Sequence, residues 1–188
     1  MKILALDMDG VVNSNKLINA WLQQETDYIK LINPELSDEK VHETVIKRFK
    51  DFFNDSKELI FTELALKVTK ICEETDACIL WTSSWRLENE YKDIEVAKEM
   101  FNRHYLPGDR LIGYTPSLHN FYGSNLRGDE IRVWLESNIY GKIKKCAVID
   151  DLIYAGFNLP ENAKFFQTNY EDGITDELVN KICRYLKD

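Results

Sequence analysis

Two carboxylates come directly after the first apolar run of the chain. Residues 3–6 are continuously apolar, which is typical of a strand buried on both faces of a parallel sheet. Asp7 and Asp9 follow; residues two apart in an extended segment point the same way, and Gly10 permits the turn. Because carboxylates are costly to bury without a cation or hydrogen bonds, this spacing predicts a cation-dependent or catalytic pocket. Two acids alone are more often a solvated strand end or a helix cap, so the rest of the chain decides.

Two later apolar runs also end in polar side chains. Residues 78–81 and 145–149 each read as a buried strand, and a helix begins between them at residue 127. The polar residues at these positions are Thr82, Ser83, Arg127, Asp150 and Asp151. Ligands of open α/β sheets bind beyond the carboxyl ends of the strands, so we expect these side chains to lie near Asp7 and Asp9.

The alternation of strands and helices predicts an α/β fold, a doubly wound three-layer parallel sheet with right-handed crossovers. A short last strand is expected at residues 164–167. Helices are expected at residues 16–32, from 37 onward, at 57–75, at 87–104, from 127 onward and at 174–186. Residues 105–126 are rich in turn formers and aromatic residues and are expected to be irregular.

Residues 14–58 separate the first strand from the other strands and are expected to form a helical insert or small cap. Residues 1–13 and 59–188 would then form the catalytic core. An aromatic stripe runs along the insert and comprises Trp21, Tyr28, Phe49, Phe52 and Phe53. This stripe predicts either packing against the core or a lid over the Asp7 cavity.

Composition excludes several classes of protein. The hydrophobic fraction of 44% and the charged fraction of 30% indicate a globular domain rather than a disordered chain. No apolar run approaches the roughly 20 residues that span a membrane, and no signal peptide precedes the first strand, so we expect a cytoplasmic protein without a membrane partner. The formal net charge of −8 disfavours non-specific nucleic-acid binding. The four cysteines lack metal-ligand spacing and are expected to be buried, reduced thiols.

Taken together, the motifs resemble those of the haloacid dehalogenase (HAD) superfamily of phosphohydrolases. Its four motifs are matched, in order, by Asp7-Met8-Asp9-Gly10, Thr82, Arg127 and Asp150-Asp151. The resemblance covers residues 1–13 and 78–168. The finer pattern of WTSSWR, GYTP, RGDEIRVWL and VIDD is similar to the HAD domains of Swiss Army Knife RNA-repair proteins.

The resemblance implies a Mg²⁺-dependent phosphomonoester hydrolase. A phosphate dianion would be repelled by these carboxylates, and Mg²⁺, which prefers oxygen ligands, removes that conflict. Asp7 is expected to attack phosphorus, to form an aspartyl-phosphate and also to bind the metal. Asp9 is expected to act first as acid and then as base, with its backbone carbonyl on the metal. Relatives that cleave carbon–halogen bonds lack an acid at this position, so Asp9 favours phosphoryl transfer over dehalogenation.

The other matched residues would hold the phosphoryl group or the metal. Thr82 and the backbone amide of Ser83 are expected to bind phosphoryl oxygens. Arg127 would neutralise the charge of the phosphoryl group or of the nucleophile. Asp150 and Asp151 would complete the magnesium shell, directly or through water.

The chain departs from the family pattern at two places. The superfamily more often has lysine at the third motif, so Arg86 and Arg132 remain alternatives to Arg127. The third acid that often follows the fourth motif is absent, since Ala155 and Gly156 stand there.

The sequence leaves the substrate open among a phosphorylated small molecule, a nucleotide and, by the RNA-repair resemblance alone, a nucleic-acid 5′ or 3′ end. A local basic track could support a nucleic-acid substrate, and it would comprise Arg86, Arg103, Arg110, Arg127 and Lys142. Side chains that could stack on bases are Trp81, Trp85, Tyr114, Phe121 and Tyr122. His119 is expected to be a surface histidine rather than a catalytic one.

Two other classes of function remain open. An acidic pocket with a hydroxyl residue on a doubly wound sheet is also typical of a phospho-receiver or binding module without turnover. Asp9 disfavours that hypothesis, because a stable phosphoaspartate needs no second acid that activates water. The third hypothesis is an interaction protein that uses residues 14–58 as its surface. The sequence does not predict the oligomeric state.

Overall fold

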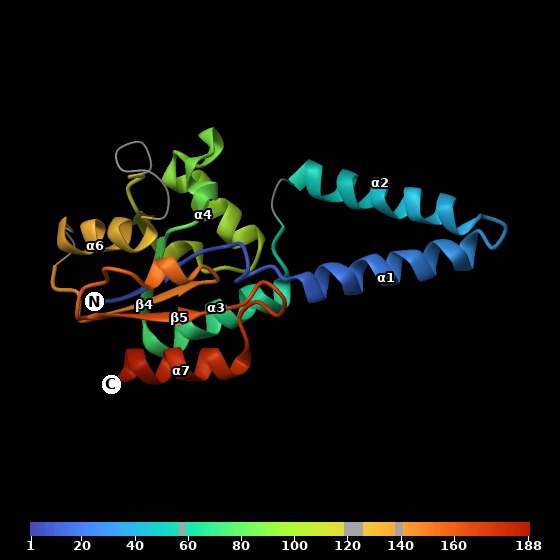
Figure 1. Ribbon diagram of the computed structural model, residues 1–188. Helices are drawn as coiled ribbons and strands as arrows, with labels where there is room; N and C mark the ends of the chain where they lie inside the picture. Colours follow the sequence, from blue (N-terminus) through green and yellow to red (C-terminus); the bar gives the residue numbers. More distant parts are fainter. Residues whose placement is uncertain (57–58, 119–125, 138–140) are drawn as a thin grey trace.

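A parallel sheet forms the centre of the molecule (Figure 1). The computed structural model describes residues 1–56, 59–118, 126–137 and 141–188, and for residues 52–56 it describes the backbone alone. Within these ranges five strands pair in the order β3-β2-β1-β4-β5, all parallel. They are β1 (Lys2–Leu6), β2 (Ala77–Trp81), β3 (Leu111–Tyr114), β4 (Lys145–Asp150) and β5 (Ala163–Gln167). The predicted α/β fold with a parallel sheet is confirmed.

Helices cover both faces of this sheet. They are α3 (Thr62–Thr75), α4 (Ile94–Arg103), α6 (Arg127–Ser137) and α7 (Asp176–Lys187). Helices α3, α4 and α7 pack on the face that carries Leu4 and Leu6, whereas α6 packs on the face that carries Ile3 and Ala5. Side chains alternate between the two faces of a strand. The continuous apolar run of β1 is therefore buried from both sides, as expected from its composition.

The register brings the carboxyl ends of the central strands level. Leu6 of β1 pairs with Trp81 of β2 and with Ile149 of β4. The pairing continues one residue beyond the strands, since Thr82 N donates to Leu6 O at 2.9 Å and Asp7 N donates to Ile149 O at 3.1 Å. The polar residues that follow these strands therefore start from one edge of the sheet.

Strand β3 lies inside the stretch that was expected to be irregular. It spans four residues, contains Gly113 and pairs with β2 at the edge of the sheet. A short run that includes glycine lacks the long apolar pattern by which a buried strand is recognised. The turn before it, a 3₁₀ helix η3 (Gly108–Arg110), agrees with the Pro107-Gly108 signal.

The helix expected at residues 87–104 begins later than predicted. Helix α4 starts at Ile94, where the Asp93 side chain accepts a hydrogen bond from Glu95 N at 2.9 Å. The residues before it form two 3₁₀ helices, η1 (Ser84–Leu87) and η2 (Asn89–Tyr91). These turns place the ring of Tyr91 against that of Trp81, with centroids 5.5 Å apart.

Helix α3 also starts later than expected, at Thr62 rather than at residue 57. Phe61 N donates to Val12 O at 2.9 Å, so the residue before the helix is bonded to the loop that follows β1. A further 3₁₀ helix, η4 (Ile153–Gly156), follows β4 and contributes the buried Ala155.

Helices α1 (Asn15–Ile32) and α2 (Asp38–Ser56) form a hairpin that extends away from the α/β body (Figure 1). A small apolar core of its own holds the two helices together and comprises Ile29, Val41 and Val45. The aromatic stripe is used within the hairpin: the ring of Trp21 packs edge-on against that of Phe49 at 5.5 Å, and the Arg48 guanidinium lies 5.6 Å from the centre of the Tyr28 ring. These three aromatic residues thus make contacts within the hairpin, and Leu17 is the hairpin residue that packs against the main core in the described part of the chain. The function of the hairpin as a lid over Asp7 stays a prediction. The side chains of Phe52 and Phe53 lie outside the described part of the chain.

None of the helices in the described ranges is both long and apolar enough to cross a membrane. The four cysteines are free. Cys72, Cys146 and Cys183 are buried, as predicted, while Cys78 is partly exposed. Burial raises the pKa of the Cys72 and Cys146 thiols to about 12, so these two are held as inert thiols.

Candidate active site

Three carboxylates, the acid group of Asp7, Asp150 and Asp151, meet at the carboxyl edge of the sheet. One oxygen from each of Asp7, Asp150 and Asp151 lies within 4.8 Å of the other two. Asp7 and Asp150 are buried, and Asp151 is partly exposed. Gly10 lies against this group with a φ of +66°, and a Cβ at that position would stand 2.7 Å from Asp151 Cβ. The loops after β1 and β4 are thus in contact, and Gly10 is what permits their close approach.

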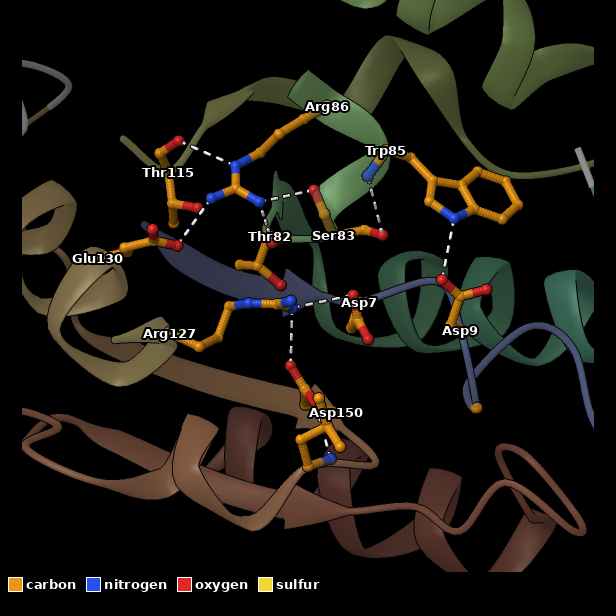
Figure 2. Close-up of polar contacts among 12 residues, drawn as sticks. Asp7, Asp9, Thr82, Ser83, Trp85, Arg86, Thr115, Arg127, Glu130 and Asp150 are labelled. Carbon is orange, nitrogen blue, oxygen red and sulfur yellow. Dashed lines mark hydrogen bonds and ion pairs between the residues drawn. The ribbon is translucent and has the colours of Figure 1, made fainter. Parts of the chain in front are cut away.

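Arg127 joins two of these carboxylates (Figure 2). Its Nη1 lies 2.9 Å from Asp7 Oδ1 and 2.8 Å from Asp150 Oδ2. Arg127 is the first residue of α6, and the next residue fixes that helix end, because a Cβ on Gly128 would stand 1.8 Å from Phe157 O. The arginine at the third-motif position therefore lies in the acid group.

The two alternatives to Arg127 lie elsewhere. Arg132 forms ion pairs with Asp129 at 2.8 Å and with Glu136 at 3.9 Å on the outside of α6. Arg86 is buried, and its guanidinium is bonded to Glu130 and to the carbonyls of Thr82 and Ser83 (Figure 2).

The electrostatics of the acid group suit a divalent cation. The three carboxylates and the Arg127 guanidinium, which is bonded to two of them, have a formal excess of two negative charges (three minus one). Burial raises the pKa of Asp7, against the opposing effect of Arg127. Burial, and next the neighbouring Asp7 carboxylate, raise the pKa of Asp150 to about 7. Carboxylates whose ionisation is disfavoured by burial and by one another are the usual ligands of Mg²⁺, so these residues fit such an ion.

Thr82 offers an unused hydroxyl beside the acid group. Its side chain is 1% exposed and points toward Asp7 and Arg127 (Figure 2). Its Oγ1 has no hydrogen-bond partner among the residues that the structure describes. A buried hydroxyl without a partner costs free energy, and a bound oxyanion would relieve that cost. The Ser83 hydroxyl is committed to the chain, because it accepts from Trp85 N at 3.4 Å and caps η1.

Asp9 is held apart from the three clustered carboxylates by two neutral donors (Figure 2). Trp85 Nε1 donates to Asp9 Oδ2 at 2.9 Å, and Asn13 Nδ2 donates to Asp9 Oδ1 at 2.9 Å. Asp9 is partly exposed, whereas Asp7 and Asp150 are buried.

A buried ion pair supports the loops around this site. Arg86 Nη2 lies 2.7 Å from Glu130 Oε2. The same guanidinium donates to the carbonyls of Thr82 at 2.5 Å, Ser83 at 2.6 Å and Thr115 at 3.1 Å. Since Glu130 lies in the first turn of α6, the pair ties the loop after β2 to the helix that carries Arg127.

Several of these contacts could not be read from the sequence. Asn13, Glu130 and the bond from Trp85 to Asp9 were not predicted. A signal was available for Arg86 and Glu130, since oppositely charged residues occur in the WTSSWR and RGDE segments that flank the predicted pocket. No spacing indicates that Trp85 reaches Asp9, which lies 76 residues earlier.

Three of the five residues of the predicted basic track are bonded elsewhere in the described part of the chain. Arg86 is committed to Glu130, while Arg110 pairs with Asp76 at 2.9 Å beside the first residue of β2. Lys142 O accepts from the N-terminal amine, next to the start of β1. These last two residues therefore lie at the amino edge of the sheet, away from Asp7.

The stacking candidates are reduced in the same way. Trp81 is fully buried among Tyr91, Phe101 and Tyr114, so it belongs to the core. Trp85 is partly exposed beside Asp9. His119, Phe121 and Tyr122 lie outside the described residues.

Comparison with protein families settles the lineage. Residues 3–179 of the 188 match the family described as the HAD domain in Swiss Army Knife RNA repair proteins. The chain belongs to this family. The match also spans the α1–α2 hairpin, so this HAD domain includes the segment in which the sequence alone showed no signature. Searches of curated proteins and of solved structures found no match. Membership indicates a HAD-type hydrolase.

Proposed function

We propose that this HAD domain is a Mg²⁺-dependent phosphomonoester hydrolase that acts through an aspartyl-phosphate on Asp7. The observation that carries the proposal is the meeting of Asp7, Asp150 and Asp151 at one edge of the sheet, with Arg127 bonded to two of them. These side chains come from three segments that are far apart in the sequence. The excess negative charge of the group calls for a cation. The Thr82 hydroxyl, which has no partner among the described residues, calls for an oxyanion.

Asp7, Asp150 and Asp151 would hold the ion, together with the backbone carbonyl of Asp9. When bound, Mg²⁺ supplies positive charge that offsets the repulsion between these carboxylates and the phosphoryl oxygens. Thr82 Oγ1 and the amide of Ser83 would donate to the phosphoryl oxygens, and Arg127 would keep the Asp7 carboxylate ionised and oriented.

In the first step a carboxylate oxygen of Asp7 attacks phosphorus, and the bond from phosphorus to the ester oxygen breaks. The leaving oxygen takes a proton from the Asp9 carboxyl group and departs as an alcohol. The products of this step are the aspartyl-phosphate and an ionised Asp9.

In the second step Asp9 accepts a proton from a water molecule as that water attacks the phosphorus of the aspartyl-phosphate. The bond from phosphorus to the Asp7 oxygen breaks, which releases inorganic phosphate. Asp7 is again a carboxylate and Asp9 is again protonated, so the cycle closes.

The proposed substrate class is supported by the family rather than by the geometry. The family is described by RNA repair, which favours nucleotides and the phosphorylated ends of nucleic acids as substrates. The absence of a basic track around Asp7 in the described residues favours a mononucleotide or a short end over a long polynucleotide.

The test is a phosphate-release screen with mononucleotides and with 5′- and 3′-phosphorylated oligonucleotides, with Mg²⁺ or with a chelator. We expect sustained release that requires Mg²⁺ and that falls by a factor of about 10³ or more in Asp7→Asn. Asp109→Asn, at the amino edge of the sheet, is the matched control and should retain activity. Near-normal turnover in Asp7→Asn would refute the nucleophile assignment.

The same screen separates a hydrolase from a phospho-receiver. A receiver would take up one phosphoryl group per chain from a donor such as acetyl phosphate and then stop. The hydrolase continues to release phosphate after the first equivalent.

A further inference from the structure

We infer that Trp85 and Asn13 are positioning residues that hold Asp9 in place for proton transfer to the leaving group, an inference that rests on the proposed function. The two residues lie in different parts of the pocket wall. Trp85 lies in η1, directly after β2, and Asn13 lies in the loop after β1, one residue before the cap of α1.

Trp85 is aimed at Asp9 by the turn that contains it. Ser83 caps this turn by accepting from Trp85 N, and Arg86 fixes the same loop through its bonds to Thr82 O and Ser83 O. Figure 2 shows the indole beside Asp9 with its nitrogen directed at the carboxylate, the bond being 2.9 Å long. These bonds therefore fix the direction in which the Trp85 indole N–H points.

Asn13 uses its whole amide group. The side chain is 1% exposed, its Oδ1 accepts from Gly10 N at 2.7 Å, and its Nδ2 donates both to Asp9 Oδ1 and to Leu59 O at 3.2 Å. Gly10 belongs to the loop of the first motif, and Leu59 belongs to the segment that returns from the hairpin. Asn13 thus fixes Asp9 relative to the segment that enters the α1–α2 hairpin and to the segment that leaves it.

The arrangement suits a group that must give up a proton and then accept one. Each donor occupies one of the two carboxylate oxygens, so the rotation of the carboxylate is fixed while further lone pairs stay available. Both donors are neutral and stabilise the negative charge that develops on Asp9 as its proton moves to the leaving oxygen. Removing one donor should therefore slow the reactions that most need this proton.

The test compares two aryl phosphates of similar size, phenyl phosphate and 4-nitrophenyl phosphate. The nitrophenolate leaves readily without a proton, whereas phenolate needs one. Because kcat/KM reports the steps up to departure of the leaving group, we expect Trp85→Phe to lower kcat/KM by about tenfold or more for phenyl phosphate and by about twofold for 4-nitrophenyl phosphate. An equal factor for both substrates would mean a merely structural role and would overturn the inference.

Trp134→Phe is the matched control, since it also removes an indole, from α6. We expect it to leave both kcat/KM values unchanged. Asn13→Ala should show the same leaving-group dependence as Trp85→Phe. If wild-type protein turns over neither aryl phosphate nor any substrate of the screen, the proposed function fails, and this result differs from an equal loss on both substrates.

A second measurement tests the contact without turnover. The chain has four tryptophans, so the Trp85 indole N–H signal can be assigned in a ¹H–¹⁵N spectrum by its loss in Trp85→Phe. We expect Asp9→Asn to shift this signal upfield and to leave the Trp134 signal in place. An unmoved Trp85 signal would show that the bond to Asp9 is absent and would overturn the inference.

Discussion

The carboxyl edge of the sheet that carries Asp7, Asp150 and Asp151 (the acid end) and the α1–α2 hairpin are stabilised in opposite ways. At the acid end, buried charges from remote segments meet, as in the bond from Arg127 to Asp7 across 120 residues. In the hairpin, apolar side chains from two adjacent helices meet, and the charged pairs stay near the solvent, as in Arg48 with Glu25. The hairpin therefore depends on local packing, whereas the acid end depends on the sheet to hold charges that repel one another.

This difference separates stability from function. Buried carboxylates that face each other destabilise a folded chain unless a cation or donors compensate them. A destabilising group of this kind is retained where it serves a function. The close grouping of Asp7, Asp150 and Asp151 fits that description. Changes at the acid end should alter activity or pH response, and changes in the hairpin should stay local.

The largest expected effect on stability comes from the Arg86–Glu130 pair. Arg86→Met leaves Glu130 buried without its cation and removes the bonds to the carbonyls after β2, so we expect a loss of about 3–5 kcal/mol in the free energy of unfolding. Arg48→Met, which breaks the partly exposed pair in the hairpin, should cost about 1 kcal/mol or less. Denaturant unfolding of both variants measures the difference, and similar costs would contradict the comparison.

The next effect is on turnover. Arg127→Ala removes the cation bonded to Asp7 and Asp150, and we expect kcat/KM to fall by about 10²–10³. Arg132→Ala, on the exposed side of the same helix, should lower it by less than about twofold. Phosphate release by the two variants measures this difference. Equal losses would place the function of Arg127 in helix stability rather than in the pocket.

A smaller effect is expected on the pH dependence of stability. In the metal-free protein the pKa of Asp150 is about 7, because of burial and then of the Asp7 charge, whereas an aspartate in the unfolded chain has a pKa of about 3.9. Between these values the folded state binds more protons than the unfolded state, so stability should fall as the pH rises from about 4 to about 7. Asp150→Asn should weaken this fall, and Mg²⁺ should offset it in the wild-type protein. The melting temperatures of both metal-free proteins at about pH 5.5 and about pH 8 measure this change in stability. If both melting temperatures change with pH in the same way, the pKa of Asp150 is not raised.

The smallest expected effect on function comes from the hairpin core. Val45→Ala removes two methyl groups from the contact between α1 and α2, which should cost about 1–2 kcal/mol of local stability. Hydrogen exchange of α1 and α2 amides should become faster, while β1 amides and Mg²⁺-dependent turnover stay unchanged. A parallel loss of turnover would show that the hairpin takes part in the chemistry.

The sequence predicted the sheet and the acid group because both depend on local patterns. Continuous apolar runs mark β1, β2 and β4, and the residues that follow them meet once the strands are parallel. Strand β3 was missed because four residues with a glycine carry too little pattern. Residue spacing does not distinguish Arg127 from Arg86, since both are arginines beside a predicted strand exit or helix start. In the structure Arg127 contacts Asp7, whereas Arg86 contacts Glu130.

The rest of the site depends on which side chains meet after folding. Trp85 reaches Asp9 because η1 turns directly after Ser83, whereas the sequence pattern predicts a helix only from residue 87 onward. The aromatic stripe of the hairpin had the right periodicity, but periodicity does not say what a helix face packs against. Neither contact has a signature in residue spacing.

The central claim is that Asp7 carries the phosphoryl group, and the most direct measurement is the mass of the chain during turnover. Asp9→Asn protein is mixed with 4-nitrophenyl phosphate and Mg²⁺, quenched in acid, digested and analysed by mass spectrometry. We predict one phosphoryl group on the peptide that contains Asp7. We predict none when Mg²⁺ is removed, and none in the double variant that carries Asp7→Asn as well as Asp9→Asn. A phosphoryl group on a residue other than Asp7 would contradict the account. Phosphate release at the wild-type rate with no phosphoryl group on the chain would contradict it as well.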